Sequence, residues 1–133
     1  DRFDLVYMTY PESYEIEEKI VLEKGKKIEK IEFPKQLLVF AIMFVRALRE
    51  NKKLEKLPSV RASLGLYERA QANALIRNHK QTEKEDVQDA IISVLAHRLR
   101  LKPSARYVMT PEDFIKEELE DFGQTSTTKG DGR

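Results

Sequence analysis

A run of nine apolar residues, LLVFAIMFV at positions 37–45, constrains the fold more than any other segment. It is far shorter than the roughly 20 residues that span a bilayer as a helix. The run follows Pro34, a residue type favoured at the first position of helices, and the segment turns basic after it. We therefore predict a helix over residues 35–51 at the centre of a small core.

Four further segments have the apolar spacing of helices that pack around this central one. Their predicted ranges are 12–23, 60–78, 83–97, and 110 to about 122. Ser59 is placed to cap the second of these helices, and Thr82 with Glu85 has the spacing of a capping box at the start of the third. Because the link between those two helices is short, we expect them to pack antiparallel.

The same spacing predicts which side chains are buried. In the first helix, Ile16 and Ile20 stand one turn apart, and Gly25 is expected to end that helix. The 60–78 helix is expected to bury Val60, Leu64, Tyr67, Ala74 and Leu75. The helix after it is expected to bury Val87, Ala90, Ile91, Val94 and Leu95.

The remaining segments are predicted to be a strand, a loop and a tail. Residues 5–10 are rich in apolar and aromatic types and stop at Pro11, which predicts a short strand. Since the sequence begins with that strand already under way, we expect a piece of a longer protein. Residues 54–58 are predicted to be a loop, and the Gly/Ser/Thr-rich end from position 123 a disordered tail.

Composition excludes several classes of function. With 41% hydrophobic and 35% charged residues the chain should fold, and its net charge of +1 gives no overall attraction to nucleic acid or anionic membranes. The absence of cysteine excludes disulfides and cysteine-based catalysis, and fits a cytoplasmic location. The most basic stretch, residues 97–102 with Arg106, is interpreted as a solvated helix end, with a contact to a neighbouring subunit as the alternative.

The sequence contains no residue set that would form an active site on its own. His79 and His97 lie far apart and are interpreted as solvated histidines at helix ends, while Ser63 and Ser93 have no nearby base. We identify no metal site. A phosphate-binding loop of the form Gly-x-x-x-x-Gly-Lys-Ser/Thr is also missing. The chain by itself is therefore not expected to be an enzyme.

The start of the 60–78 helix is the strongest candidate for binding. The segment PSVRASLGLYERAQANALIR places Arg61 in the first turn, two residues after Ser59. A guanidinium offers planar donors that match phosphate oxygens, and the unpaired N–H groups of a helix N-terminus favour anions. An exposed arginine in a first turn is also an ordinary surface residue, so this segment alone leaves both interpretations open.

Several segments in order support a more specific interpretation. DRFDLVYMTYP, SVRASLGLYERAQANALI, TEKEDVQDAI and LAHRLRL together resemble the C-terminal part of an AAA+ ATPase of the MoxR group and its magnesium-chelatase relatives. The resemblance covers about residues 1–102. It implies a mainly α fold, with one short strand from the ATPase core followed by a small helical bundle, the lid.

The resemblance also implies a division of the chain. The parts are the end of the core (1–11), a helix and linker (12–32), the lid domain (33–102), an added C-terminal helix (103–122) and the tail (123–133).

The resemblance implies roles for individual residues. Arg2 matches the arginine finger, which reaches the γ-phosphate held by a neighbouring subunit. Arg61 matches the sensor 2 arginine, which couples lid position to the nucleotide, with Ser59 beside it. ATP and Mg²⁺ would act in the full-length protein, whereas this fragment alone would bind neither. The implied assembly is a ring of identical subunits, with six the expected number, that remodels a client protein or helps to assemble a metal-containing complex.

Two alternatives are compatible with the same residues. The lid of a helicase of the minichromosome-maintenance type has a similar Val-Arg helix, although the near-neutral charge argues against nucleic acid as a partner. A helical interaction module without a nucleotide role belongs to a different class. A phosphate-binding loop upstream of Asp1 would favour the ATPase, and its absence would exclude it.

Overall fold

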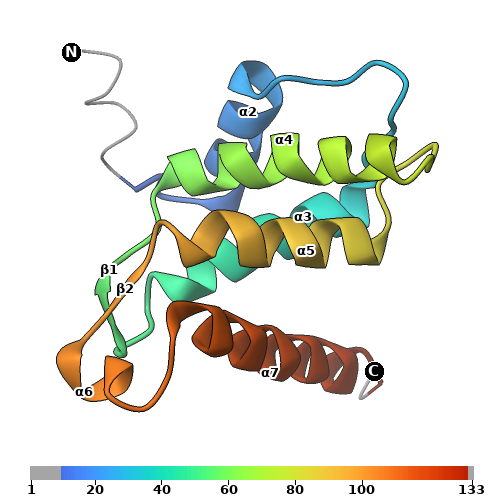
Figure 1. Cartoon of the computed structure of the whole chain (residues 1–133). Coiled ribbons are helices and arrows are strands. Elements are labelled where there is room, and N and C mark those ends of the chain that lie inside the picture. The colour runs from blue at the N-terminus through green and yellow to red at the C-terminus, as the bar shows by residue number, and fades with distance from the viewer. Residues whose placement is uncertain (1–9, 132–133) are drawn as a thin grey trace.

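The computed structural model describes residues 10–131. Within that range the chain forms six helices and one two-stranded sheet (Figure 1). The elements are α2 (Tyr14–Lys24), α3 (Lys35–Leu48), β1 (Leu54–Lys56), α4 (Val60–Ile76), α5 (Lys84–Ala96), β2 (Arg100–Leu101), α6 (Pro103–Arg106) and α7 (Pro111–Asp131). The mainly helical class is confirmed, whereas the strand predicted over 5–10 lies outside the described residues except for Tyr10.

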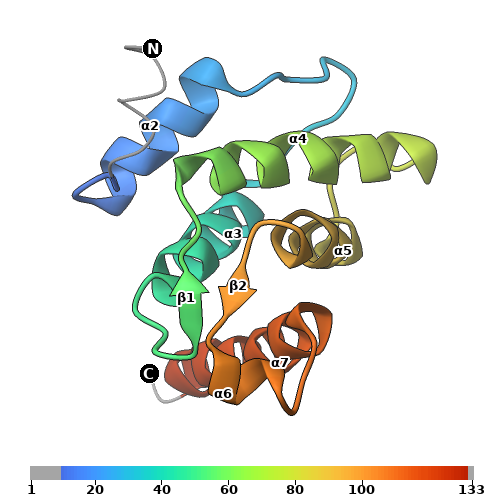
Figure 2. The same ribbon diagram turned by 60° about the vertical axis from the view of Figure 1, so that its left-hand side comes forward.

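Helices α4 and α5 lie side by side and run in opposite directions, as the short link between them predicted (Figures 1 and 2). Helix α3 packs against both of them, and α2 packs on α3 and α4. On the other side of α5 lies α7, so that α5 is covered from two sides. Helix α2 is therefore part of the same packed unit as the helices that follow it.

The apolar run at 37–45 is buried at the centre, as predicted. Helix α3 buries the side chains of Leu38, Ala41, Ile42, Phe44, Val45 and Leu48. The ring of Phe122 in α7 lies edge-on to Phe40 and Phe44, with centroids 5.5 Å from each. Burying a side chain the size of Phe44 contributes about 1.5–3 kcal/mol, so this aromatic group fixes α7 against α3.

The predicted N-terminal cap is confirmed for α4, whereas the predicted capping box of α5 is wrong. The Ser59 hydroxyl caps α4 as predicted, accepting a hydrogen bond from Arg61 N at 3.2 Å. The predicted box of Thr82 with Glu85 is wrong by one residue, because Glu83 and Asp86 form the capping box of α5. Thr82 is fully buried, and its backbone N–H donates to the carbonyl of Glu32 at 2.8 Å, which holds it ahead of the helix.

Two expectations about buried faces are wrong. Ile16 in α2 and Leu75 in α4 are 46% and 47% exposed. The buried positions of α2 are instead Glu17 and Val21, one residue further round the helix. The spacing of Ile16 and Ile20 therefore does not mark the buried face of α2.

The sheet was not predicted. Leu54 pairs with Leu101 and Lys56 with Arg100 in antiparallel register, with an irregularity between the two pairs. The segment predicted to be a loop therefore contains β1, and the basic stretch interpreted as a helix end contains β2. Both leucines are buried, at 4% and 2% exposed. The pairing joins residues almost fifty positions apart, so the sequence around either strand does not predict it.

The C-terminal part also differs from the prediction. The added helix expected over 103–122 is two helices, α6 and α7. The expected end of the second near Phe122 is wrong, because α7 continues to Asp131 where a disordered tail was predicted. No proline follows Pro111, and extending an existing helix costs far less than starting one. No helix of residues 10–131 is long and apolar enough to cross a membrane.

Candidate functional site

The first turn of α4 carries the predicted phosphate-facing residues. Ser59 precedes the helix in an extended conformation, and Arg61 is an exposed residue of its first turn. The structure therefore brings two of the three predicted site residues together at one helix N-terminus. The third, Arg2, lies outside the described residues.

The arginine that follows the last residue of α3 fixes the approach to this turn. Arg49 Nε donates a hydrogen bond of 2.8 Å to the carbonyl oxygen of Pro58, the residue before the cap. The Arg49 side chain is only 6% exposed. Because a guanidinium is planar and carries its donors in fixed directions, this bond sets where α4 begins relative to α3.

The same guanidinium binds a buried carboxylate of α2. Arg49 Nη1 and Nη2 donate to Glu17 Oε1 and Oε2 at 2.7 and 2.6 Å, a two-pronged ion pair. Ser63, one turn into α4, donates its hydroxyl to Glu17 Oε2 at 2.7 Å. Glu17 is 0% exposed. A single carboxylate thus holds together α2, α3 and the start of α4.

Glu17 also holds the segment that leads into α2. Arg46 Nη1 donates to Glu17 Oε1 at 3.0 Å and to the carbonyl oxygen of Pro11 at 3.0 Å, and its Nη2 donates to the carbonyl of Glu12 at 3.3 Å. The Arg49 guanidinium lies 5.0 Å from the centroid of the Tyr10 ring. We call Glu17, Arg46, Arg49 and Ser63 the buried ionic cluster.

The electrostatics of the buried ionic cluster keep Glu17 charged. Burial by itself would raise the pKa of Glu17, but hydrogen bonds from Arg49, Ser63 and Arg46, with the charge of Arg49, outweigh it and hold that pKa below its ordinary value. The cluster therefore contains two cations and one anion. Removing the anion would leave two buried or half-buried guanidinium groups without their partner.

Sequence reasoning missed this cluster. Glu17 is one of several acidic residues in a charged helix, so nothing local distinguishes it. The available signal was at the C-terminal end of α3, where Arg46 and the C-cap residue Arg49 stand three positions apart after an apolar run. Residues at that spacing share a helix face, and two cations on the inner side of a core helix require a buried anion.

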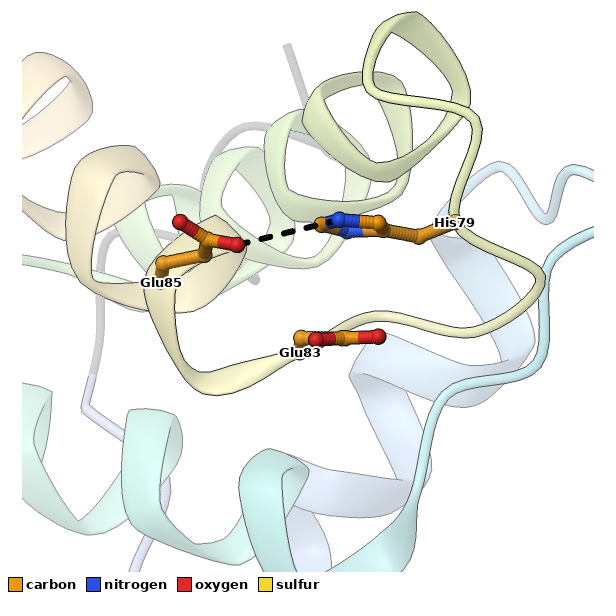
Figure 3. Close-up of side chains that lie close together, drawn as sticks. All are labelled: His79, Glu83 and Glu85. Atoms are coloured by element: carbon orange, nitrogen blue, oxygen red, sulfur yellow. Dashed lines mark ion pairs between the residues drawn. The ribbon is translucent and has the colours of Figure 1, made fainter.

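A second polar group lies at the opposite end of α4, around the start of α5 (Figure 3). A ring nitrogen of His79 and one carboxylate oxygen each of Glu83 and Glu85, atom types that can bind a metal ion, lie within 4.8 Å of one another. Nε2 of His79 is 3.7 Å from Glu85 Oε1. His79 Nδ1 lies 2.8 Å from Oδ2 of the fully buried Asp86.

Capping and ion pairing account for this second group. The Glu83 carboxylate accepts from the backbone of α5, and Asp86 accepts from the backbone N–H of Glu83 at 2.9 Å. Arg77 donates to Asp86 at 3.0 Å and also binds Asp89. His79 is thus a bonded part of the turn between α4 and α5, with a side chain 20% exposed, rather than the solvated histidine that the sequence suggested.

Known proteins share this helical arrangement. The profile of a family described as an AAA lid domain matches residues 46–118, more than half of the chain. The fold is similar to the crystal structure of a candidate ATPase from Cytophaga hutchinsonii, with a TM-score of 0.58 and 22% sequence identity. That match covers 69% of this chain and 31% of the other, so the chain corresponds to about a third of that protein. None of the curated proteins matches it.

Proposed function

The chain belongs to the AAA lid domain family, and on that premise we propose that it is the lid of a MoxR-type AAA+ ATPase in which Arg61 senses the γ-phosphate of ATP. The observation that carries the proposal is the position of Arg61, exposed in the first turn of α4. A helix N-terminus has partial positive charge and favours anions. The guanidinium adds donors suited to phosphate oxygens.

The chain supplies only part of the nucleotide site. Its sequence has no phosphate-binding loop, so the residues present would not hold ATP and Mg²⁺ by themselves. In the proposed full-length protein, ATP and Mg²⁺ supply the chemistry of phosphoryl transfer, in which water takes the place of ADP on the γ-phosphorus. Arg61 would stabilise the charge that spreads over the phosphoryl oxygens, and Ser59 would keep its helix turn in place.

The wider role follows from the same proposal. Movement of the lid with the state of the nucleotide would transmit ATP hydrolysis to a client protein, or to the assembly of a metal-containing complex. Arg2 would act on the nucleotide of a neighbouring subunit, which requires a ring of subunits, with six the expected number. A helical interaction module without a nucleotide role is the weaker alternative, because the chain belongs to an ATPase lid family.

Replacing Arg61 tests the proposal. In the full-length protein, Arg61→Ala should slow ATP turnover by about 10²-fold, the loss typical when one preorganised donor is removed from developing charge. Steady-state hydrolysis measures this. Arg69→Ala is the matched control, because Arg69 is an exposed arginine two turns further along α4.

Two results must accompany the loss of turnover. Circular dichroism melting should show that both variants keep the helical fold, and Arg69→Ala should turn over ATP as the wild type does. Wild-type turnover in Arg61→Ala would refute the sensor role.

A further inference from the structure

We propose that Glu17 is a positioning residue of this ATPase site: its buried carboxylate couples the segment entering the lid to the first turn of α4 and so sets where Arg61 points. This inference rests on the proposed role of Arg61. It adds a residue of another helix, with no contact to the nucleotide, on which the action of Arg61 depends.

The carboxylate has contacts on both sides that the coupling needs. Toward α4, Glu17 accepts from the Ser63 hydroxyl at 2.7 Å and from both terminal nitrogens of Arg49. Arg49 in turn donates to the carbonyl of Pro58, which immediately precedes the Ser59 cap. The first turn of α4 is therefore held at its start by Arg49 and at its inner face by Ser63, with Arg61 between the two.

Toward the N-terminus, the contacts run through Arg46. Its guanidinium binds Glu17 and the carbonyl oxygens of Pro11 and Glu12. These two residues belong to the stretch that follows the predicted core strand. A shift of that stretch would displace Arg46, and the shared carboxylate would pass the displacement to Arg49 and Ser63. The contacts that connect residue 11 with the first turn of α4 therefore pass through the carboxylate of Glu17.

The charge of Glu17 is what makes it suited to this role. With an exposed fraction of 0% it has no solvent to replace a lost partner. Four donor atoms converge on its two oxygens, and hydrogen bonds to a charged acceptor are shorter and stronger than those to a neutral one. A glutamine of nearly the same shape would lose the charge and present an amide NH₂ to donors, so the guanidinium groups would reorient.

A double-variant experiment on the full-length ATPase tests the coupling. We expect Glu17→Gln to lower kcat for ATP at least about tenfold. The variant Glu17→Gln with Arg61→Ala should turn over ATP no more slowly than Arg61→Ala alone, because residues that act through one another are not additive. A merely structural role would instead multiply the two losses, and that result overturns the inference.

Two further variants keep the test decisive. Glu15→Gln removes a charge from an exposed position of the same helix and should leave kcat unchanged. Arg49→Lys keeps the charge but cannot bind Glu17 with two nitrogens and Pro58 with a third. It should show the same non-additivity with Arg61→Ala, and it carries the test if melting curves show that Glu17→Gln does not fold.

The remaining outcomes separate the two proposals. Wild-type kcat in both Glu17→Gln and Arg49→Lys, together with a slow Arg61→Ala, overturns the inference and leaves the proposed function standing. Wild-type kcat in Arg61→Ala overturns the proposed function, and this inference with it.

Discussion

Gly25, which follows α2, shows how a single residue sets the distance between two helices. A Cβ at this position would lie 2.6 Å from Cδ2 of Tyr67 in α4 and 2.6 Å from the carbonyl oxygen of Val21. The φ angle of Gly25 is −74°, which any residue can adopt. The position therefore requires glycine for space, and the close approach lets Tyr67 stack on Phe33 with ring centroids 5.3 Å apart.

Gly25→Ala should lower the free energy of unfolding by about 1–3 kcal/mol, the usual cost of forcing extra volume into a packed site. The matched control is Gly123→Ala in α7, where an added Cβ meets no atom within 4 Å. Since alanine is favoured over glycine inside a helix, this control should raise the same quantity by about 0.5–1 kcal/mol. Urea denaturation of both variants measures the difference, and equal effects would contradict the steric argument.

Individual residues could be predicted where their role is local. The cap formed by Ser59 and the position of Arg61 in the first turn both follow from the sequence around them. Thr82 could not be assigned correctly, because its backbone is held by Glu32 from a distant part of the chain. The same applies to Glu17, whose burial depends on two arginines about thirty positions later.

At the scale of elements, the turn between α4 and α5 is held by hydrogen bonds and ion pairs of charged side chains. Two residues after the end of α4, Asn78 lies in the left-handed region at φ 62°, a conformation that asparagine tolerates better than most residues. The His79 N–H then bonds back to the carbonyl of Ala74 at 2.8 Å. This places the His79 ring against the buried carboxylate of Asp86, which is part of the next helix.

The two side chains shift each other's titration. The hydrogen bond to Asp86 raises the pKa of His79 above its ordinary value of about 6.5. Burial would raise the pKa of Asp86, but hydrogen bonds from His79, the Glu83 backbone and Arg77 outweigh it and hold that pKa below its usual value near 4.

The pH dependence of stability follows from these directions. The contribution of His79 should be complete below about pH 6.5 and be lost as pH rises through its raised pKa, while that of Asp86 is lost as pH falls below about 4. His79→Gln should therefore reduce the free energy of unfolding more at pH 6 than at pH 9, as measured by denaturation at both values. His97→Gln is the control, and a loss in His79→Gln that is equal at both pH values would exclude the ion pair.

Elements were predictable where the apolar spacing of a helix runs through their whole length. Helices α3, α4 and α5 have several turns of apolar spacing, and each was placed within about three residues at either end. Strands β1 and β2 have three and two residues and exist only because they pair with each other across the intervening helices. The extension of α7 beyond Phe122 was missed because glycine and threonine are weak helix formers in isolation.

At the scale of the whole molecule, the order of short motifs carried the prediction. No single motif identifies the chain, but the motifs from Ser59 to Leu101 lie within residues 46–118, which the AAA lid domain family matches. The MoxR group, the ring and the client stay predictions. Arg2 lies outside the described residues.

The role of Arg2 can be tested by mixing subunits. In the proposed ATPase, a full-length Arg2→Ala protein would keep its own nucleotide site, and a second protein with a disabled phosphate-binding loop would keep its own arginine. If Arg2 acts on a neighbour, mixed rings should recover turnover above the sum of the two separate proteins, since an arginine supplied in trans is worth roughly 10³–10⁵ in rate. Turnover equal to that sum, in a mixture shown by light scattering to form rings, rules out the assignment.

The buried ionic cluster also limits how this lid can be exchanged between relatives in evolution. The segment that matches the family begins at Arg46, whereas the carboxylate that binds Arg46 lies 29 residues earlier. A recombination event between these positions would bring together an acid and two arginines of different ancestry. An exchange that keeps the cluster intact would therefore have to carry the chain from at least Glu17 onward.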